Sequence, residues 1–265
     1  MLIYIVGFLI SFLACVIGRV CGLGGGVIIK PTLDAFHMMD VTSISFLSSC
    51  TVLAMTAYSV YNAIRKKEVE MDMRVSTFLA IGSCVGGILG KSLFGKVKMV
   101  LSNGEMIGMI QAVLMLAMLM ISLLYTLNRS KIKSFHLSNP AASAVIGGLL
   151  GLFSAFIGGG SGPMNMAVLF FFFTMSTKLA AVNSLYIILV SQAASLVQTF
   201  FSGSIRTVEF NPILFVGMVC FALIGTQVGR KVNQKISEER VNQLFIVLLA
   251  VLICVNVRNA IMYLK

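Results

Sequence analysis

Glycines interrupt two long apolar stretches of this chain, at corresponding positions of its two halves. The first break, residues 22–26, precedes a short apolar segment at 27–38, and the second, residues 158–162, precedes another at 163–174. A glycine that interrupts a helix frees backbone N–H groups, and the positive end of the helix that follows favours an anion. The glycines proposed to bind a small anion are Gly24, Gly25, Gly26, Gly158, Gly159 and Gly160.

The composition places the chain in a membrane. Of its 265 residues, 58% are hydrophobic and 11% are charged, and the mean hydropathy is +0.99. A helix needs about 20 residues to cross the bilayer core, so the two segments after the breaks are too short for an upright span. We therefore expect an all-α polytopic membrane protein with eight full spans and two short helices. The ten apolar segments are 2–21, 25–39, 42–64, 74–95, 105–127, 140–157, 161–175, 178–202, 210–229 and 241–262.

No motif for redox, metal or nucleotide chemistry is found in the sequence. The 6 cysteines stand singly inside apolar segments, without the C-x-x-C spacing of metal or redox sites. The phosphate-binding pattern G-x-x-x-x-G-K-S/T is absent as well. We expect no cofactor and no metal site, and secondary transport is simpler than transport driven by ATP.

The positive charge of the chain indicates a membrane topology. The formal net charge is +11, and the basic residues cluster in short loops at 65–74, 129–133 and 230–240. Basic loops of membrane proteins face the cytoplasm, and this topology signal accounts for the positive charge. We therefore expect no nucleic-acid partner. If the short segments re-enter without crossing, the two halves are parallel and loop 230–240 lies outside. If they cross, the halves are inverted and all three loops lie inside, which the charges favour.

The order of segments repeats from one half to the other. Each half contains a long helix, a glycine break, a short helix and three long helices, which predicts repeats at 1–127 and 140–265 joined by a polar linker at 128–139. Polar pairs occupy similar positions after each break, Ser48-Ser49 in the first half and Asn183-Ser184 in the second. Either these pairs bind the substrate or they pack helices together.

The two breaks resemble those of the sulfite exporter TauE/SafE family of membrane transporters. The family motif, Gly-x-Gly-Gly-Gly followed by four residues and Pro-x-Leu, falls on residues 22–33, and the break at Gly158 is similar to its second copy. The resemblance implies export of small sulfur-containing or organic anions, such as sulfite or sulfonates, across the cell membrane. In a bacterium this would be the inner membrane. Asn165 departs from it, standing where the second copy would have proline. Pro163 lies two positions earlier, so the second short helix is expected to start later or bend differently.

Two cations adjoin the first break. Arg19 precedes it and Lys30 follows it, and a basic residue at membrane depth is costly and usually functional. Both are candidate anion ligands. The alternatives are that Arg19 reaches a membrane interface and that Lys30 pairs with Asp34 one turn later. Asp34, the one carboxylate of this short segment, is also a candidate for proton coupling.

Other functions remain as alternatives to anion transport. The chain could carry another small solute or a metal ion, or serve as a membrane scaffold without a substrate. Residues 159–162 fit the G-x-S-G pattern of intramembrane serine proteases, although no histidine follows Ser161 to act as its base. We therefore expect no enzyme activity. The expected partners are the lipid bilayer and a small anionic substrate, and a homo-oligomer is left open.

Overall fold

The structure, a computed structural model, is built from helices, and its described residues contain no strand. It describes residues 2–36, 39, 41–66, 73–101, 104–129, 131–137, 139–157, 161–201 and 211–262. The helices of the first half are α1 (Leu2–Cys21), α2 (Gly26–Ala35), α3 (Val41–Arg65), α4 (Met73–Leu101) and α5 (Gly104–Asn128). Those of the second half are α6 (Pro140–Ile157), α7 (Gly162–Phe173), α8 (Thr177–Phe201), α9 (Pro212–Lys235) and α10 (Glu238–Met262).

Seven helices of the described residues are long and apolar enough to cross a membrane: α1, α3, α4, α5, α8, α9 and α10. The protein is therefore a polytopic all-α membrane protein. Eight spans were expected, and the difference is α6, which has only 18 residues and counts among the shorter apolar helices. The short helices α2 and α7 have 10 and 12 residues, as the apolar segments after the breaks predict.

The basic loops lie at one end of the helix bundle. Arg129, just after α5, interacts electrostatically with Glu238, the first residue of α10. The N–H of Thr177, the first residue of α8, donates a hydrogen bond of 3.3 Å to the same carboxylate. Ser76 in the first turn of α4 donates to the Asn183 side chain of α8. The end of α5 and the starts of α4, α8 and α10 therefore share this end, which is what inverted halves predict.

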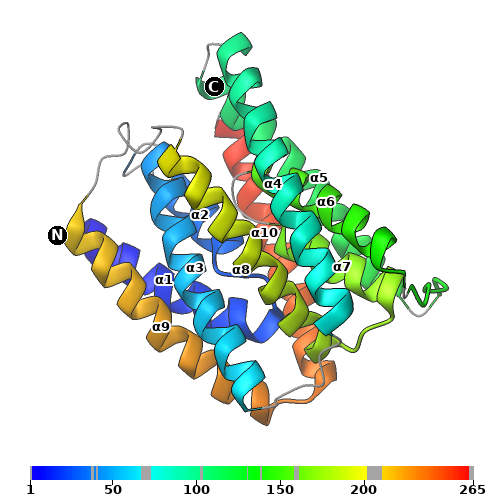
Figure 1. Cartoon of the computed structure of the whole chain (residues 1–265). Helices are drawn as coiled ribbons and strands as arrows, with labels where there is room; N and C mark the ends of the chain where they lie inside the picture. The colour runs from blue at the N-terminus through cyan, green and yellow to red at the C-terminus, as the bar shows by residue number, and fades with distance from the viewer. Residues whose placement is uncertain are drawn as a thin grey trace.

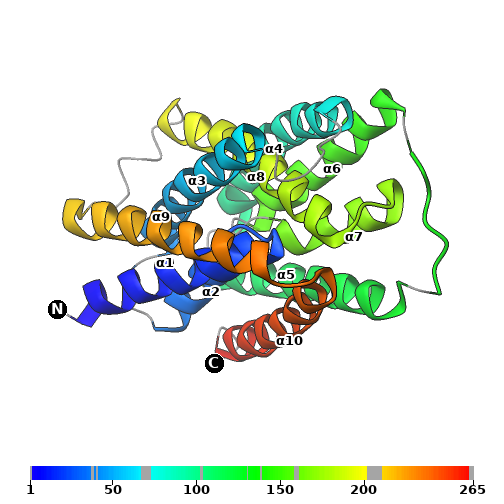
Figure 2. The same cartoon turned by 90° about the horizontal axis from the view of Figure 1, so that it is seen from below.

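In the second half, α7 returns to the end at which α6 begins. The N–H of Phe135, in the linker, donates to the carbonyl of Phe171 at 2.8 Å, and that of Leu137 donates to the carbonyl of Phe172 at 2.9 Å. These bonds satisfy two of the carbonyls that the last turn of α7 leaves free. Figure 2 shows the linker passing along the end of α7 before α6 begins. Helices α6 and α7 thus run in opposite directions, and we call this pair of helices the second hairpin.

In the first half, α1 and α2 form the corresponding hairpin. The Tyr4 hydroxyl near the start of α1 accepts a hydrogen bond of 2.8 Å from Asn211, the N-cap of α9. Leu33 near the end of α2 packs in one cluster with Leu214 of α9 and Ile44 of α3, both in the first turns of their helices. The start of α1 and the end of α2 therefore share the end of the bundle opposite the basic loops.

Two helix pairs approach each other closely along glycines, α1 with α9 and α4 with α6 (Figure 1). A Cβ atom built on Gly82, Gly86 or Gly90 of α4 would lie 2.0, 1.9 or 2.5 Å from a backbone oxygen of α6. A Cβ on Gly225 or Gly229 of α9 would lie 2.4 Å from a backbone oxygen of α1. A side chain at these positions would collide with the partner backbone, so glycine permits both contacts. Gly82, Gly86 and Gly90 thus lie on the face of α4 that packs against α6.

The helix contacts pair the two halves in a matching way. The first helix of each half packs on the fourth helix of the other, α1 on α9 and α6 on α4. The third helices, α3 and α8, pack on each other, and so do the fifth, α5 and α10. This pattern supports a division into repeats 1–127 and 140–265 joined by linker 128–139, which stays a prediction.

Candidate substrate site at the two helix breaks

The two breaks meet inside the bundle. A Cβ atom built on Gly162, the first residue of α7, would lie 2.0 Å from the carbonyl oxygen of Leu23 in the first break. Both residues are buried, and Leu23 is 1% exposed. The backbone of one break is therefore in direct contact with the start of the short helix that follows the other. A side chain at position 162 would separate them.

Glycine conformations shape the first break. Gly22 and Gly24 have φ angles of 69° and 65°, in the left-handed region that side chains disfavour. Gly22 also lies against α8, where a Cβ atom would come within 2.3 Å of the Cα of Ala181. Among the described residues, no acceptor pairs with the N–H groups of Gly26 and Val27, the first two of α2. This helix therefore begins with free donors at its positive end.

The second break has a different chemistry. Gly158, Gly159 and Gly160 lie outside the described residues, so their predicted role stays a prediction. Ser161 is the N-cap of α7, and Pro163 lies in its first turn. Helix α2 begins five residues before Pro31, whereas α7 begins at Gly162, three residues before Asn165, which stands in the place of that proline. Helix α7 therefore starts later than α2, as Pro163 led us to expect. Pro163 has no N–H, so it contributes no donor to this turn.

Lys30 and the second hairpin are connected by hydrogen bonds. The Lys30 ammonium, in a side chain 6% exposed, donates to Oε1 of Gln111 on α5 at 3.1 Å. Nε2 of Gln111 donates in turn to the carbonyl of Phe156 at 3.1 Å, near the end of α6. Lys30 also interacts electrostatically with Asp34, as the pairing alternative predicts. Sequence reasoning missed Gln111, because a single glutamine in an apolar helix matches no motif.

Arg19 is buried at the last turn of α1. Its residue is 1% exposed, and its Cβ lies 3.1 Å from where a Cβ on Gly229 of α9 would stand. The next residue, Val20, accepts a hydrogen bond of 3.0 Å from Asn233 of α9. Because Arg19 of α1 is buried against α9, the alternative in which its side chain reaches the membrane surface is disfavoured. Its role as an anion ligand stays a prediction.

The predicted polar pairs lie on helices that contact the first break. On α8, Asn183 and Ser184 lie between two residues that face it, Ala181 beside Gly22 and Ile188 beside Gly24. Asn183 accepts from Ser76 and donates to the carbonyl of Leu179 at 2.9 Å, so it ties α8 to α4. The buried Ser184 hydroxyl has no partner among the described residues. The helix-packing alternative thus fits Asn183, whereas Ser184 keeps a free donor.

The first-half pair lies one turn from the break. Ser48 is buried at 3% exposure, and Ser49 is partly exposed. Ser48 precedes Val52 by four residues on α3, and Val52 lies 3.6 Å from where a Cβ on Gly24 would stand. Residues four apart share one helix face, so Ser48 lies on the face of α3 that points toward the break.

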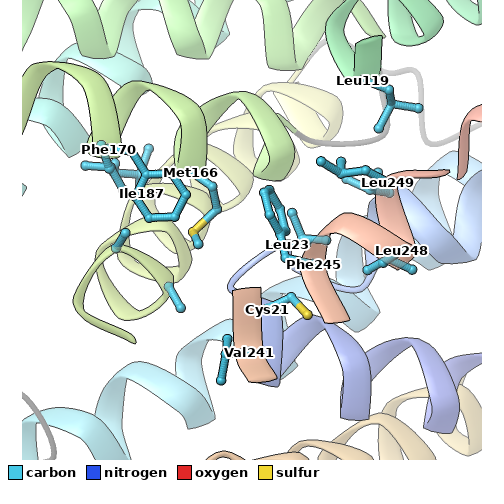
Figure 3. Close-up of a cluster of buried hydrophobic side chains, with 14 of the residues drawn as sticks. Cys21, Leu23, Leu119, Met166, Phe170, Ile187, Val241, Phe245, Leu248 and Leu249 are labelled. Carbon is cyan, nitrogen blue, oxygen red and sulfur yellow. The ribbon is translucent and has the colours of Figure 1, made fainter. Parts of the chain in front are cut away.

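Apolar side chains enclose the junction of the breaks. Leu23 belongs to one buried cluster with Met166 of α7 and Phe245 of α10 (Figure 3). Ile187 of α8 and Leu119 of α5 belong to the same cluster. Side chains from four helices, α5, α7, α8 and α10, therefore share the buried cluster that contains Leu23.

The Ser161 hydroxyl, at the N-cap position of α7, is bound to a side-chain amide and not to a base. Its hydroxyl donates to Oδ1 of Asn165 at 2.8 Å, and nucleophilic catalysis would need a basic partner in that place. Of the two histidines, His136 is exposed in the linker and His37 lies outside the described residues. The arrangement gives no support to the protease alternative.

Comparisons with known proteins agree with this architecture. Residues 7–256 match the family described as "Sulfite exporter TauE/SafE". The chain is 24% identical to the "Probable membrane transporter protein YunE" of Bacillus subtilis (strain 168), over 95% of this chain and 96% of that protein. No solved structure matches the chain. Proteins of this family are membrane transporters and not enzymes. The chain is thus a multi-pass membrane transporter that belongs to the sulfite exporter TauE/SafE family.

Proposed function

We propose that this protein is a secondary transporter that exports small sulfur-containing or organic anions, such as sulfite or sulfonates, and binds them where the two breaks meet. The observation that supports the proposal is the contact between Gly162, the first residue of α7, and Leu23, which lies three residues before α2 begins. Helix N-termini offer free N–H groups and a positive dipole end, which together favour an anion. The other predicted ligands, including Arg19, Ser48 and Ser184, lie on helices that contact this junction or the first break.

The buried ammonium of Lys30 supports an anionic substrate. Inserting a lysine at the centre of a membrane helix costs about 2.5–3.5 kcal/mol on insertion scales, so such residues are retained for function. Asp34 and Gln111 balance Lys30 in this conformation. An anion bound at the start of α2 would add a second negative partner. A substrate without negative charge would gain nothing from this arrangement.

The packing suggests which parts move during alternating access. Side chains of α1, α2, α3 and α9 share one buried cluster, and the glycine contact between α1 and α9 lies within this group. The corresponding group of the other half is α4, α6, α7 and α8, with the glycine contact between α4 and α6. Backbone contacts along glycines are rigid, so we infer that each group moves as a unit. The substrate site between them would open first to one side and then to the other.

The basic loops orient the proposed transporter. Arg129, Lys131 and Lys133 in the linker and Arg240 at the start of α10 belong to the end of the bundle that also holds the start of α4. Positively charged loops remain on the cytoplasmic side during insertion. We therefore assign this end to the cytoplasm and the opposite end, where α1 begins and α2 ends, to the outside.

Flux measurements on the purified protein in proteoliposomes test the proposal. Wild-type protein should carry sulfite, whereas Gly162→Ala should abolish the flux because the new methyl group pushes the second break away from Leu23. Gly25→Leu should have the same effect at the first break. Gly95→Ala on α4 is the matched control, because a Cβ atom there meets nothing within 4 Å. Full flux through both break variants would reject this site.

A further inference from the structure

One buried amide at the second break has an unused donor. Asn165 lies in the first turns of α7 and is 0% exposed. Its Oδ1 accepts a hydrogen bond of 2.8 Å from the Ser161 hydroxyl, and its Nδ2 has no partner among the described residues. A buried donor without an acceptor destabilises the folded protein. Native proteins rarely retain such a group unless a ligand or a bound water pairs with it.

The amide lies where the two breaks meet. Asn165 follows Gly162 by three residues, and residues three apart share one face of a helix. Gly162 is the residue that contacts the Leu23 carbonyl, so this face of α7 points toward the first break. The bond from Ser161, the N-cap, fixes the amide at the positive end of α7. The unused donor is thus part of the junction.

The donor also compensates for Pro163. A regular first turn offers several free N–H groups to a ligand, and proline removes one of them. The backbone N–H of Asn165 is unavailable too, because it donates to the Ser161 carbonyl at 2.8 Å. A side-chain amide in this turn returns one donor to the site. Its N–H groups, like backbone amides, pair with an acceptor oxygen.

We propose that Asn165 binds the substrate directly through Nδ2, and that the group it binds is an oxygen of a sulfite or sulfonate ligand. This assignment rests on the proposed anion transport. Ser161 acts as a positioning residue, because its hydroxyl occupies Oδ1 and leaves Nδ2 for the ligand. The second half then contributes a neutral donor, whereas the first half contributes the charge of Lys30.

Binding of sodium sulfite and sodium ethanesulfonate to purified protein, measured as thermal stabilisation at constant ionic strength, tests the assignment. Asn165→Leu removes the donor, and a lost hydrogen bond to a charged group should weaken binding about tenfold to a hundredfold. The melting temperature without ligand should stay close to that of the wild type, because loss of the unpaired Nδ2 donor offsets loss of the acceptor for the Ser161 hydroxyl. Asn165→Asp keeps the shape of the side chain and should abolish binding by repulsion.

Asn62→Leu is the matched control. Asn62 is a buried asparagine near the end of α3, and its amide already donates to the Tyr58 carbonyl at 2.8 Å. Affinity should stay at the wild-type value in this variant. If wild-type protein binds neither anion, the proposed function fails. If wild-type protein binds and Asn165→Leu binds equally well, only the assignment of Asn165 fails. Loss of folded protein in both Asn165 variants would make the amide structural and would also overturn it.

Discussion

The two breaks share a geometry but differ in their chemistry. The first uses glycines with positive φ angles, and the helix that follows contains Lys30 with Asp34 one turn later. The second uses a serine cap and Pro163, and α7 contains no charged residue. Position five of α2 is Lys30, and the same position of α7 is Met166. Two halves with the same architecture can therefore contribute differently to the site. The first half supplies a charged side chain, and the second supplies neutral hydrogen-bonding groups.

The comparison of the two breaks assumes that the two halves of the chain are inverted in the membrane. Cysteine labelling tests this assumption, because each position either reacts in intact cells or does not. In a cysteine-free background, Lys133→Cys in the linker and Ser237→Cys before α10 should both resist a membrane-impermeant maleimide in intact cells. Both should react after permeabilisation, because both positions are exposed at the same end of the bundle. Parallel halves would place the two positions on opposite sides, so that labelling of one alone in intact cells would contradict the fold assignment.

Removal of the charge should have the largest effect on transport. Lys30→Met leaves Asp34 without its cation and the anion without its counter-charge. Truncating one partner of a buried charge pair costs about 2–5 kcal/mol of binding, which corresponds to at least about a thirtyfold loss of anion affinity. Lys91→Met is the control, because its ammonium is held on α8 by the Ser195 carbonyl at 2.7 Å and the Ser195 hydroxyl at 3.0 Å. Equal loss in both variants would show a general effect of buried lysines.

Gln111 connects the charged break to the neutral one, so its removal should have a smaller effect. Gln111→Leu leaves the Phe156 carbonyl without its donor and deprives Lys30 of an acceptor. We expect anion affinity to fall about tenfold, as for a hydrogen bond to a charged group. Gln198→Leu on α8, whose amide donates to the Ile88 carbonyl at 3.3 Å, should leave affinity unchanged. Binding titrations that show no difference between the two variants would remove Gln111 from the site.

The smallest effects should appear where the halves are alike. Gly86→Ala in the contact of α4 with α6 and Gly225→Ala in that of α9 with α1 should each reduce the free energy of unfolding by about 1–3 kcal/mol, as overpacking does. Gly87→Ala is the control, because its Cβ would meet only an oxygen 4.0 Å away. Thermal denaturation measures all three. Strong destabilisation by only one of Gly86→Ala and Gly225→Ala would mean that the two helix contacts are not equivalent.

Much of the fold could be predicted from hydropathy and glycine spacing. The ten apolar segments became the ten helices, and Gly82, Gly86 and Gly90 repeat every four residues, as a helix contact requires. A Cβ atom on Gly87 would lie 4.0 Å from the nearest oxygen of α6, so this position does not need glycine for the contact. Helix α6 is shorter than a span because the polar linker precedes it and the second break follows it. The expected eighth full span is therefore absent from the candidate spans of the described residues.

The site was harder to predict, because its decisive contacts join distant parts of the chain. The repeat predicted that the breaks correspond, but only the folded structure brings Gly162 to the Leu23 carbonyl. Pairing of Lys30 with Asp34 followed from their spacing on one helix. Gln111 could not be found in this way, since its partners lie on α2 and α6. Asn165 was visible only as a departure from the family motif, and burial revealed its unused donor.

The central claim, that the meeting point of the breaks binds an anion, is tested most directly by a ligand panel on the purified wild-type protein. A ligand that binds the native state raises the melting temperature, and the rise grows with the logarithm of the ligand concentration above its Kd. We expect sulfite, thiosulfate or sulfonates to stabilise the protein, and Lys30→Met to remove that stabilisation. Stabilisation by divalent metal ions alone, with no response to any anion, would contradict the account.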